Sequence, residues 1–175
     1  MAYLINFVLF QLAWFAGILG AAHQQVLIGI LAMILCLIVH LWSLPKVSRR
    51  AEYRLMLQCF CLGTLIDTVL MHAGIMVYAS PNPIGFLSPL WMSLLWVALA
   101  MTLNHSLAWL KNKYWLSAIL GSITGPLSYL AGVRLDAGSM PHEISSLVTL
   151  SIIWALSMPL IIFWAKQSLK KSHEI

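Results

Sequence analysis

Long runs of apolar residues, separated by short polar connectors, follow one another along the whole chain. Each run holds roughly 19–25 residues, enough for an α-helix to cross a hydrocarbon core of about 30 Å. The pattern predicts an all-α polytopic membrane protein, a single domain over residues 1–175 that forms a bundle of six transmembrane helices. The six spans are expected at residues 3–22, 26–44, 55–79, 89–110, 114–133 and 144–165.

Composition narrows the class of protein further. Hydrophobic residues make up 61% of the chain and charged residues 9%, against roughly a quarter charged in an ordinary soluble domain. The mean hydropathy is +0.90. These values exclude a soluble globular domain, a disordered tail and a disulfide-rich secreted module. Cys36, Cys59 and Cys61 lie in or beside apolar spans, so we expect small core residues there and no zinc site.

The basic residues predict how the chain is oriented. With six antiparallel spans, nine of the ten Lys and Arg residues fall on the side that holds both termini, and only Arg134 falls on the other. Positive charge is enriched in cytoplasmic loops, so both termini are expected in the cytoplasm (N-in/C-in). The basic loops favour contact with anionic lipids, and no nucleic-acid partner is expected because no aromatic platform accompanies them.

Asp67 is the most informative polar residue, because a charged carboxylate at the centre of a membrane span costs about 2.5–3.5 kcal/mol. Its neighbours on the same helical face are small or slightly polar, so it should point into the bundle, against Trp14, Asn104 or Tyr129. It is either a functional site or a carboxyl that hydrogen-bonds another helix for packing. His72 is rotated away from Asp67 on the same helix, so no direct pairing is expected.

Four further polar residues are expected about one turn inside the cytoplasmic boundary: His40, Gln58, Asn104 and His105. They form either one polar layer, in which histidines can carry protons, or separate hydrogen bonds between helices. No His-x-x-x-His or Glu-x-x-His spacing is present, so neither a metal site nor a cofactor is predicted.

On the opposite side, Arg134 is expected near Asp136, His142 and Glu143 at the mouth of the bundle. One interpretation is that Arg134 binds a lipid phosphate. The other is a solvated loop in which Arg134 pairs with Asp136, while Glu143 starts the last helix.

Small residues in the fifth span predict close packing of helices. Gly121, Gly125, Ser128 and Gly132 form one stripe along that helix, and small residues allow backbones to approach each other. Pro126 lies within the same segment and removes one backbone donor, so a kink or a freed carbonyl is expected there.

Segments at residues 10–15, 65–67, 91–107 and 125–132 resemble a family of small proteobacterial inner-membrane proteins that is catalogued only as a domain of unknown function. The WxxxLWxxxAxTLN and GPLxYxAG motifs carry the resemblance, which covers nearly the whole chain. His105 departs from the smaller apolar residue expected after Asn104. The resemblance implies a multi-pass protein of the bacterial inner membrane and no established catalytic residues. Members are encoded near cyclopropane-fatty-acid-synthase-like methyltransferases, which implies a link to lipid modification or envelope stress.

Three functions follow from these features. The first is a lipid- or envelope-related accessory or binding protein, whose partners are membrane lipids, a membrane enzyme or a second copy of the chain. The second is an intramembrane lipid-modifying enzyme with Asp67 as general acid or base, and the third is a small proton-coupled transporter that titrates Asp67. The first is favoured because no nucleophile motif accompanies Asp67. The candidate site residues are Asp67, His72, Asn104, His105, Tyr129 and Arg134.

Overall fold

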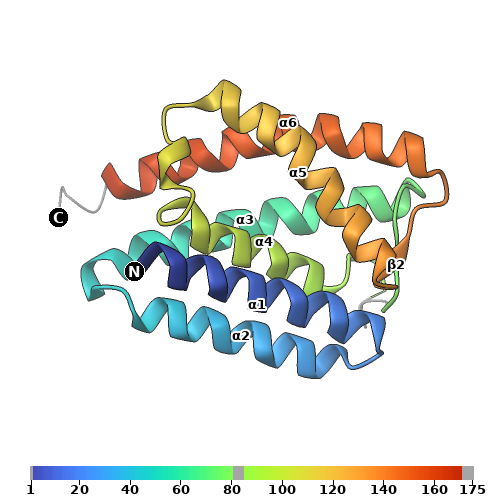
Figure 1. The fold of residues 1–175 in the computed structure, drawn as a ribbon, viewed down its shortest axis with the longest axis horizontal. Coiled ribbons are helices and arrows are strands. Elements are labelled where there is room, and N and C mark those ends of the chain that lie inside the picture. The colour runs from blue at the N-terminus through green and yellow to red at the C-terminus, as the bar shows by residue number, and fades with distance from the viewer. Residues whose placement is uncertain (1, 81–84, 171–175) are drawn as a thin grey trace.

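The chain folds into a bundle of six α-helices, so the prediction of an all-α protein is confirmed (Figure 1). The computed structural model describes residues 2–80 and 85–170. A 3-10 turn, η1 (Ala108–Leu110), follows the fourth helix, and two short strands, β1 (Val77–Tyr78) and β2 (Gly138–Ser139), pair antiparallel. The helices are α1 (Ala2–Ala22), α2 (Val26–Trp42), α3 (Lys46–His72), α4 (Leu90–Leu103), α5 (Tyr114–Arg134) and α6 (Glu143–Lys170).

The short helix α4 forms the centre of the bundle. It packs against α1, α2, α3 and α6, and ten of its 14 residues are buried. Around it, α1 pairs with α2, and α5 pairs with α6 while crossing the long axis of the molecule at a steeper angle than the other helices (Figure 1). A helix that is apolar on all sides is buried among other elements, which explains the position of α4.

Four helices in the described part of the chain are long and apolar enough to cross a membrane: α1, α3, α5 and α6. The apolar helices α2 and α4 are shorter, at 17 and 14 residues. Large apolar side chains also cover the outside of the bundle, such as Leu27, Leu65 and Leu156, each more than 60% exposed. Apolar area of this extent is typical of a surface that contacts lipid. The six-span topology itself stays a prediction.

Two helices differ most from the predicted spans. The third span was expected at residues 55–79, whereas α3 begins at Lys46 and ends at His72. Hydropathy locates the apolar part of a helix, and α3 continues beyond it through a basic segment; it stops before Gly74, whose φ of +68° ends a helix readily. The fourth span was expected to reach residue 110, but α4 ends at Leu103. Asp67 therefore lies five residues from the end of α3, not near its middle.

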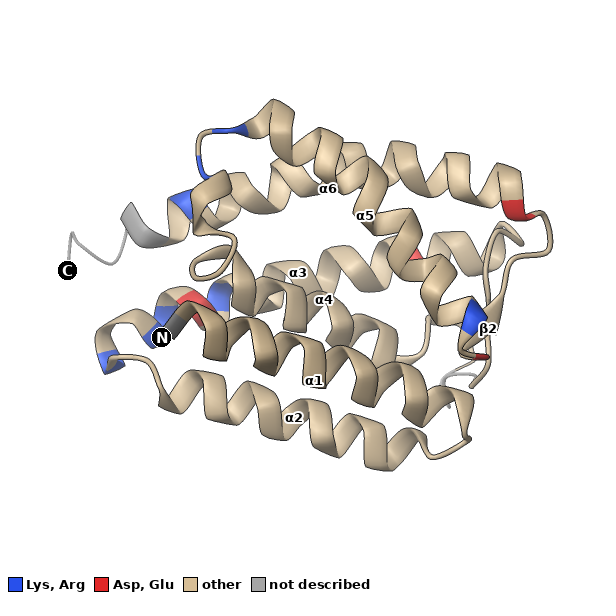
Figure 2. Cartoon of the chain, viewed as in Figure 1, with Lys and Arg blue, Asp and Glu red and all other residues tan. Residues whose placement is uncertain are grey.

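The charges are distributed as the sequence predicts. Lys and Arg gather at the end of the bundle where the N-terminus and the last described turns of α6 lie, and Arg134 marks the opposite end (Figure 2). The starts of α3 and α5 lie at the same basic end. The N-in/C-in orientation itself stays a prediction.

Cysteine labelling tests that orientation. In a variant without the three native cysteines, we expect a membrane-impermeant maleimide added to intact cells to label His142→Cys and to leave Val47→Cys unlabelled. Both positions are exposed, at opposite ends of the bundle, and the basic end should face the cytoplasm. Labelling of Val47→Cys alone would show that the protein has the opposite orientation. Permeabilised cells, in which both should react, serve as the control.

Candidate functional site

Asp67 lies fully buried and accepts three hydrogen bonds from three other elements. The hydroxyl groups of Tyr78 and Tyr129 donate to Oδ1 over 2.7 and 2.6 Å, and the indole Nε1 of Trp96 donates to Oδ2 over 2.9 Å. The prediction that Asp67 points into the bundle beside Tyr129 is confirmed. The other two expected neighbours bond elsewhere: Trp14 donates to Ser128, and Asn104 donates to Glu52 and Ser168.

The β1–β2 ribbon brings Tyr78 to Asp67. Val77 pairs with Ser139 and Tyr78 with Gly138, which joins the loop after α3 to the loop after α5. A Cβ at Gly138 would lie 2.4 Å from the carbonyl oxygen of Val77, so this close pairing requires glycine. The hydrophobic pattern predicts Tyr78 near the end of the third span and gives no signal that it is a partner of Asp67.

Two tryptophans stack at the centre of the bundle and are enclosed by two glycines. The rings of Trp96 on α4 and Trp154 on α6 lie 4.5 Å apart and nearly parallel, at 8°. A Cβ at Gly63 on α3 would lie 2.1 Å from the Trp96 ring, and one at Gly125 on α5 would lie 2.2 Å from the Trp154 ring. The absence of a side chain at both glycines therefore lets four helices meet around one aromatic pair.

A cavity of about 410 Å³ adjoins this pair, with walls from α1, α4, α5 and α6. Trp96, Tyr78 and Tyr129 line it, and Asp67 lies behind them as their common hydrogen-bond acceptor. The Asp67 carboxyl accepts hydrogen bonds from the polar groups of all three side chains. What these side chains present to the cavity is therefore mainly aromatic surface.

The cavity opens between α1 and α5. Phe10 and Trp14 on α1 are partly exposed, and Thr124 on α5 is exposed, where they border it. One hydrogen bond spans the two helices, from the indole Nε1 of Trp14 to the hydroxyl of Ser128, over 3.0 Å. The opening therefore faces the surroundings of the bundle sideways, between two helices that are apolar enough to cross a membrane.

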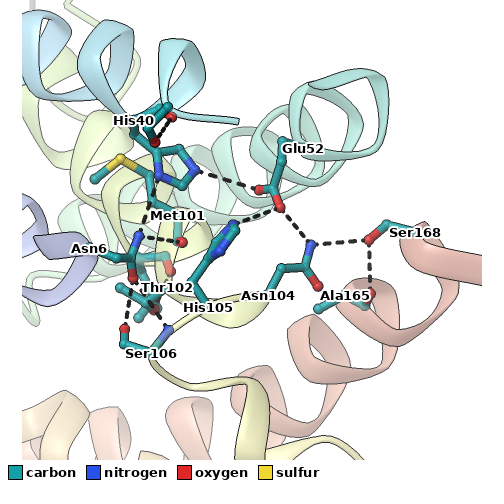
Figure 3. Close-up of polar contacts among 12 residues, drawn as sticks. Asn6, His40, Glu52, Met101, Thr102, Asn104, His105, Ser106, Ala165 and Ser168 are labelled. Atoms are coloured by element: carbon teal, nitrogen blue, oxygen red, sulfur yellow. Dashed lines mark hydrogen bonds and ion pairs between the residues drawn. The ribbon is translucent and has the colours of Figure 1, made fainter. Parts of the chain in front are cut away.

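A second polar cluster lies at the basic end of the bundle, around the buried Glu52 of α3 (Figure 3). His105 Nε2 and Asn104 Nδ2 lie 3.2 and 3.0 Å from Glu52 Oε1, and His40 Nε2 lies 3.9 Å from Oε2. Three members of the expected polar layer thus converge. The fourth, Gln58, does not join them and lines a shallow surface depression with Trp164.

Glu52 was not predicted as a site residue, because it lies among basic residues that indicate a connector between two spans. In the structure it shares a buried helical face with Leu55, Met56 and Cys59, at spacings of three, four and seven residues. That periodicity, continued back into the basic segment, is the signal that would have identified it.

The charge of Glu52 needs partners because a buried carboxylate without them is strongly destabilising. His40 and His105 face it directly, and the half-buried Lys111 lies close enough to interact with it electrostatically. Burial lowers the pKa of the Lys111 ammonium, and the attraction of Glu52 acts in the opposite direction. Lys111, His40 and His105, of which the histidines are cationic only when protonated, thus surround the single acid Glu52.

The remaining candidate residues lie at the surface and apart from both clusters. His72 is exposed, with its Nε2 2.8 Å from the carbonyl oxygen of Phe86. Arg134 is also exposed and pairs with Glu143 over 3.3 Å. The expected pairing of Arg134 with Asp136 is therefore wrong, because the chain turns at Asp136, which has a φ of +65°, and brings the start of α6 to the arginine.

The fold is thus an α-helical bundle with four helices long and apolar enough to cross a membrane, a buried carboxyl behind aromatic side chains and an internal cavity. The chain belongs to the family described as "Protein of unknown function (DUF2878)", whose model matches residues 3–160. The expected membership in a family of unknown function is thus confirmed. No curated protein and no solved structure matches the chain.

Proposed function

We propose that this protein binds lipid or a lipid-like amphipathic molecule in the cavity between α1 and α5, as an accessory protein of the membrane. The observation that carries the proposal is the cavity of about 410 Å³ with its largely aromatic and aliphatic walls. Its volume falls within the range of about 300–1,000 Å³ that is usual for small-molecule sites. Because it opens between two apolar helices, membrane lipid is the nearest source of a ligand.

Few polar groups line the cavity, and the indole N–H groups of Trp91 and Trp154 among them lack an acceptor in the described part of the chain. The Trp91 side chain lines the cavity and is 2% exposed, and its indole N–H has no hydrogen-bond partner among the residues that the structure describes. Buried donors without partners are costly. A ligand with an apolar chain and one polar acceptor would fill the cavity and satisfy this donor, which favours an amphipathic molecule over a pure hydrocarbon.

In this proposal Asp67 is a positioning residue. It orders Tyr78, Trp96 and Tyr129, which come from three different elements, and so shapes the cavity wall. The lipid-modifying enzyme and the proton-coupled transporter both require Asp67 to meet substrate or water. Its complete burial behind three donors favours binding over either alternative.

The location and partners of the protein belong to the same proposal. We place it in the bacterial inner membrane as a multi-pass protein whose basic end contacts anionic lipid. Apolar residues such as Leu35 and Leu156 also leave a surface on which a membrane enzyme or a second copy of the chain can pack.

A variant that fills the cavity tests the proposal. The protein is purified in mild detergent, and lipid retained by each chain is measured by native mass spectrometry and by lipid extraction. Leu120 of α5 lines the cavity. We expect Leu120→Trp to weaken lipid retention about tenfold, because overpacking typically costs about 1–3 kcal/mol and 1.4 kcal/mol corresponds to tenfold in affinity.

Leu127→Trp is the matched control. It lies on the same helix and makes the same chemical change, but its side chain is 55% exposed on the outside of the bundle. It should retain lipid like the wild type. Equal retention by both variants and the wild type would show that the lipid binds elsewhere and would reject the proposal.

A further inference from the structure

Three potential metal ligands meet at the basic end of the bundle, although they are far apart in the sequence. His40 lies in the last turn of α2, Glu52 lies in the second turn of α3, and His105 follows α4. One ligand atom from each residue lies within 4.8 Å of the other two. The two imidazole rings stand 5.0 Å apart and almost perpendicular, at 82°, and Glu52 lies within reach of both (Figure 3).

Two of these ligand atoms lack a hydrogen bond. Nε2 of His40 and Oε2 of Glu52 have no hydrogen-bond partner among the described residues, and their side chains are only 2% and 3% exposed. They face each other over 3.9 Å, which is too long for a hydrogen bond. Buried polar atoms in this state are few in proteins, and a bound ion is one arrangement that satisfies them.

We propose that His40, Glu52 and His105 bind one divalent transition-metal ion of the first row, of the Zn²⁺ type. Two imidazole nitrogens and one carboxylate oxygen are the donor set that zinc and its neighbours prefer, and three protein ligands leave a position open for a further one. The proposal is independent of lipid binding in the cavity, because the cluster lies at the other end of α3.

The distances fit such an ion after an adjustment of the side chains. Zinc binds nitrogen and oxygen at about 2.0–2.2 Å, so two ligand atoms of a tetrahedral ion lie roughly 3.3–3.5 Å apart. His105 Nε2 lies 3.2 Å from Glu52 Oε1, and His40 Nε2 lies 3.9 Å from Oε2. Because the three ligand atoms lie within 4.8 Å of one another, the side chains would need to close by up to about 1.4 Å to reach this standard.

Surrounding side chains hold the ligands in place, as outer residues do in metal sites. Asn104 Nδ2 donates to Glu52 Oε1 and orients the carboxylate. Asn6 Nδ2 lies 3.3 Å from His40 Nδ1 and is itself bonded to the Met101 carbonyl. An ion on Nε2 leaves the ring proton on Nδ1, where only the oxygen of a turned Asn6 amide could accept it. The Ser106 hydroxyl, 2.9 Å from Asn6 Oδ1, can follow that turn, but the hydrogen bonds to the Met101 carbonyl and from the Ser106 backbone N–H would be lost.

An ion can reach the cluster from the aqueous side. The His105 side chain is 26% exposed, whereas those of His40 and Glu52 are almost fully buried. His105 follows the end of α4, at the basic end of the bundle, beside the turn that leads to η1. His105 is therefore the ligand nearest to solvent, and His40 and Glu52 close the site toward the interior of the bundle.

Metal titration of the purified, full-length protein tests the proposal. After removal of metal with a chelator, Zn²⁺ is added, and bound zinc is counted by mass spectrometry after desalting. We expect one zinc ion per chain in the wild type. His105→Ala and Glu52→Gln should each weaken binding at least tenfold, since even the loss of an outer-layer residue commonly weakens metal binding by about 10–100-fold.

His72→Ala is the matched control, since it removes an exposed histidine at the other end of α3. It should bind zinc as the wild type does. Because His105 is partly exposed, its replacement should leave the bundle folded, which gel filtration checks.

Co²⁺ titration of the wild type alone provides a readout that needs no variant. A four-coordinate site of nitrogen and oxygen donors should give intense visible absorption that aqueous Co²⁺ lacks. The proposal is overturned if the wild type shows no such absorption, or if His105→Ala binds zinc as tightly as the wild type. In either case the histidines and Glu52 would serve only to neutralise one another.

Discussion

Asp67→Asn is expected to destabilise the folded protein by about 2–3 kcal/mol, the upper part of the range for a buried donor that loses its acceptor. An asparagine keeps one oxygen for the hydroxyl groups of Tyr78 and Tyr129. Its amide nitrogen, however, would face the indole Nε1 of Trp96 at a distance of 2.9 Å, so that two donors oppose each other in a fully buried site. Reversible unfolding in mixed micelles, followed by tryptophan fluorescence, measures the change in free energy.

Two further variants make the result specific. Tyr78→Phe removes one of three hydrogen bonds and leaves the carboxyl with the other two, so a smaller loss of about 1 kcal/mol is expected. Asp136→Asn makes the same chemical change as Asp67→Asn at an exposed position with a φ of +65°, which asparagine also adopts, and should leave the stability unchanged. If Asp67→Asn is as stable as the wild type but retains no lipid, the acid acts in function directly and does not serve as a positioning residue.

Gly125→Ala is expected to destabilise the protein by a net amount of about 2 kcal/mol, even though alanine favours helices over glycine by about 1 kcal/mol. The new Cβ would lie 2.2 Å from the Trp154 ring. That ring is stacked on Trp96, and Gly63 closes the other side of the pair. Trp96 blocks movement of the Trp154 ring away from α5, so the overlap must displace the ring toward the cavity or separate α5 from α6. Unfolding under the same conditions measures the loss, and Gly63→Ala should behave alike.

The GPLxYxAG motif of α5 also contains the control position for Gly125→Ala. Gly132→Ala lies seven residues further along α5, and its nearest neighbour would be the flexible Cδ1 of Ile18 at 3.2 Å. A small displacement of that methyl group suffices, so the stability should stay within about 1 kcal/mol of the wild type. Equal losses at Gly125 and Gly132 would mean that the effect comes from the helix itself and not from the tryptophan pair.

The sequence predicts the helices well where apolar residues and helix coincide. The bounds of α1, α2 and α5 agree with the predicted spans to within two residues. They disagree for α3, because its first turns carry Lys46, Arg49 and Arg50, and a hydropathy average treats these as a loop although they are helical. The ribbon formed by β1 and β2 involves only two residues per strand and leaves no periodic signal.

The candidate site could be predicted only in part. Asp67 was identified from the cost of burying a charge, and Tyr129 was one of three residues expected beside it. Trp96 and Tyr78 could not be identified as its partners, because the order of helices around the bundle and the ribbon that carries Tyr78 depend on contacts between distant segments. The convergence of His40 with His105 could not be predicted for the same reason, since the two residues lie 65 positions apart in the chain.

The two buried acids also determine how α3 sits in the bundle. Glu52 and Asp67 are 15 residues apart, roughly 22 Å along the helix axis and about 60° around it, so both face the side occupied by α4 and the turn that follows it. Each is held by side chains from other elements. A slide of α3 by a single turn, about 5.4 Å, would remove both carboxyls from their donors at the same time. Contacts at two positions along α3 therefore fix its axial position in the bundle, and they also fix the positions of the neighbouring helices relative to it.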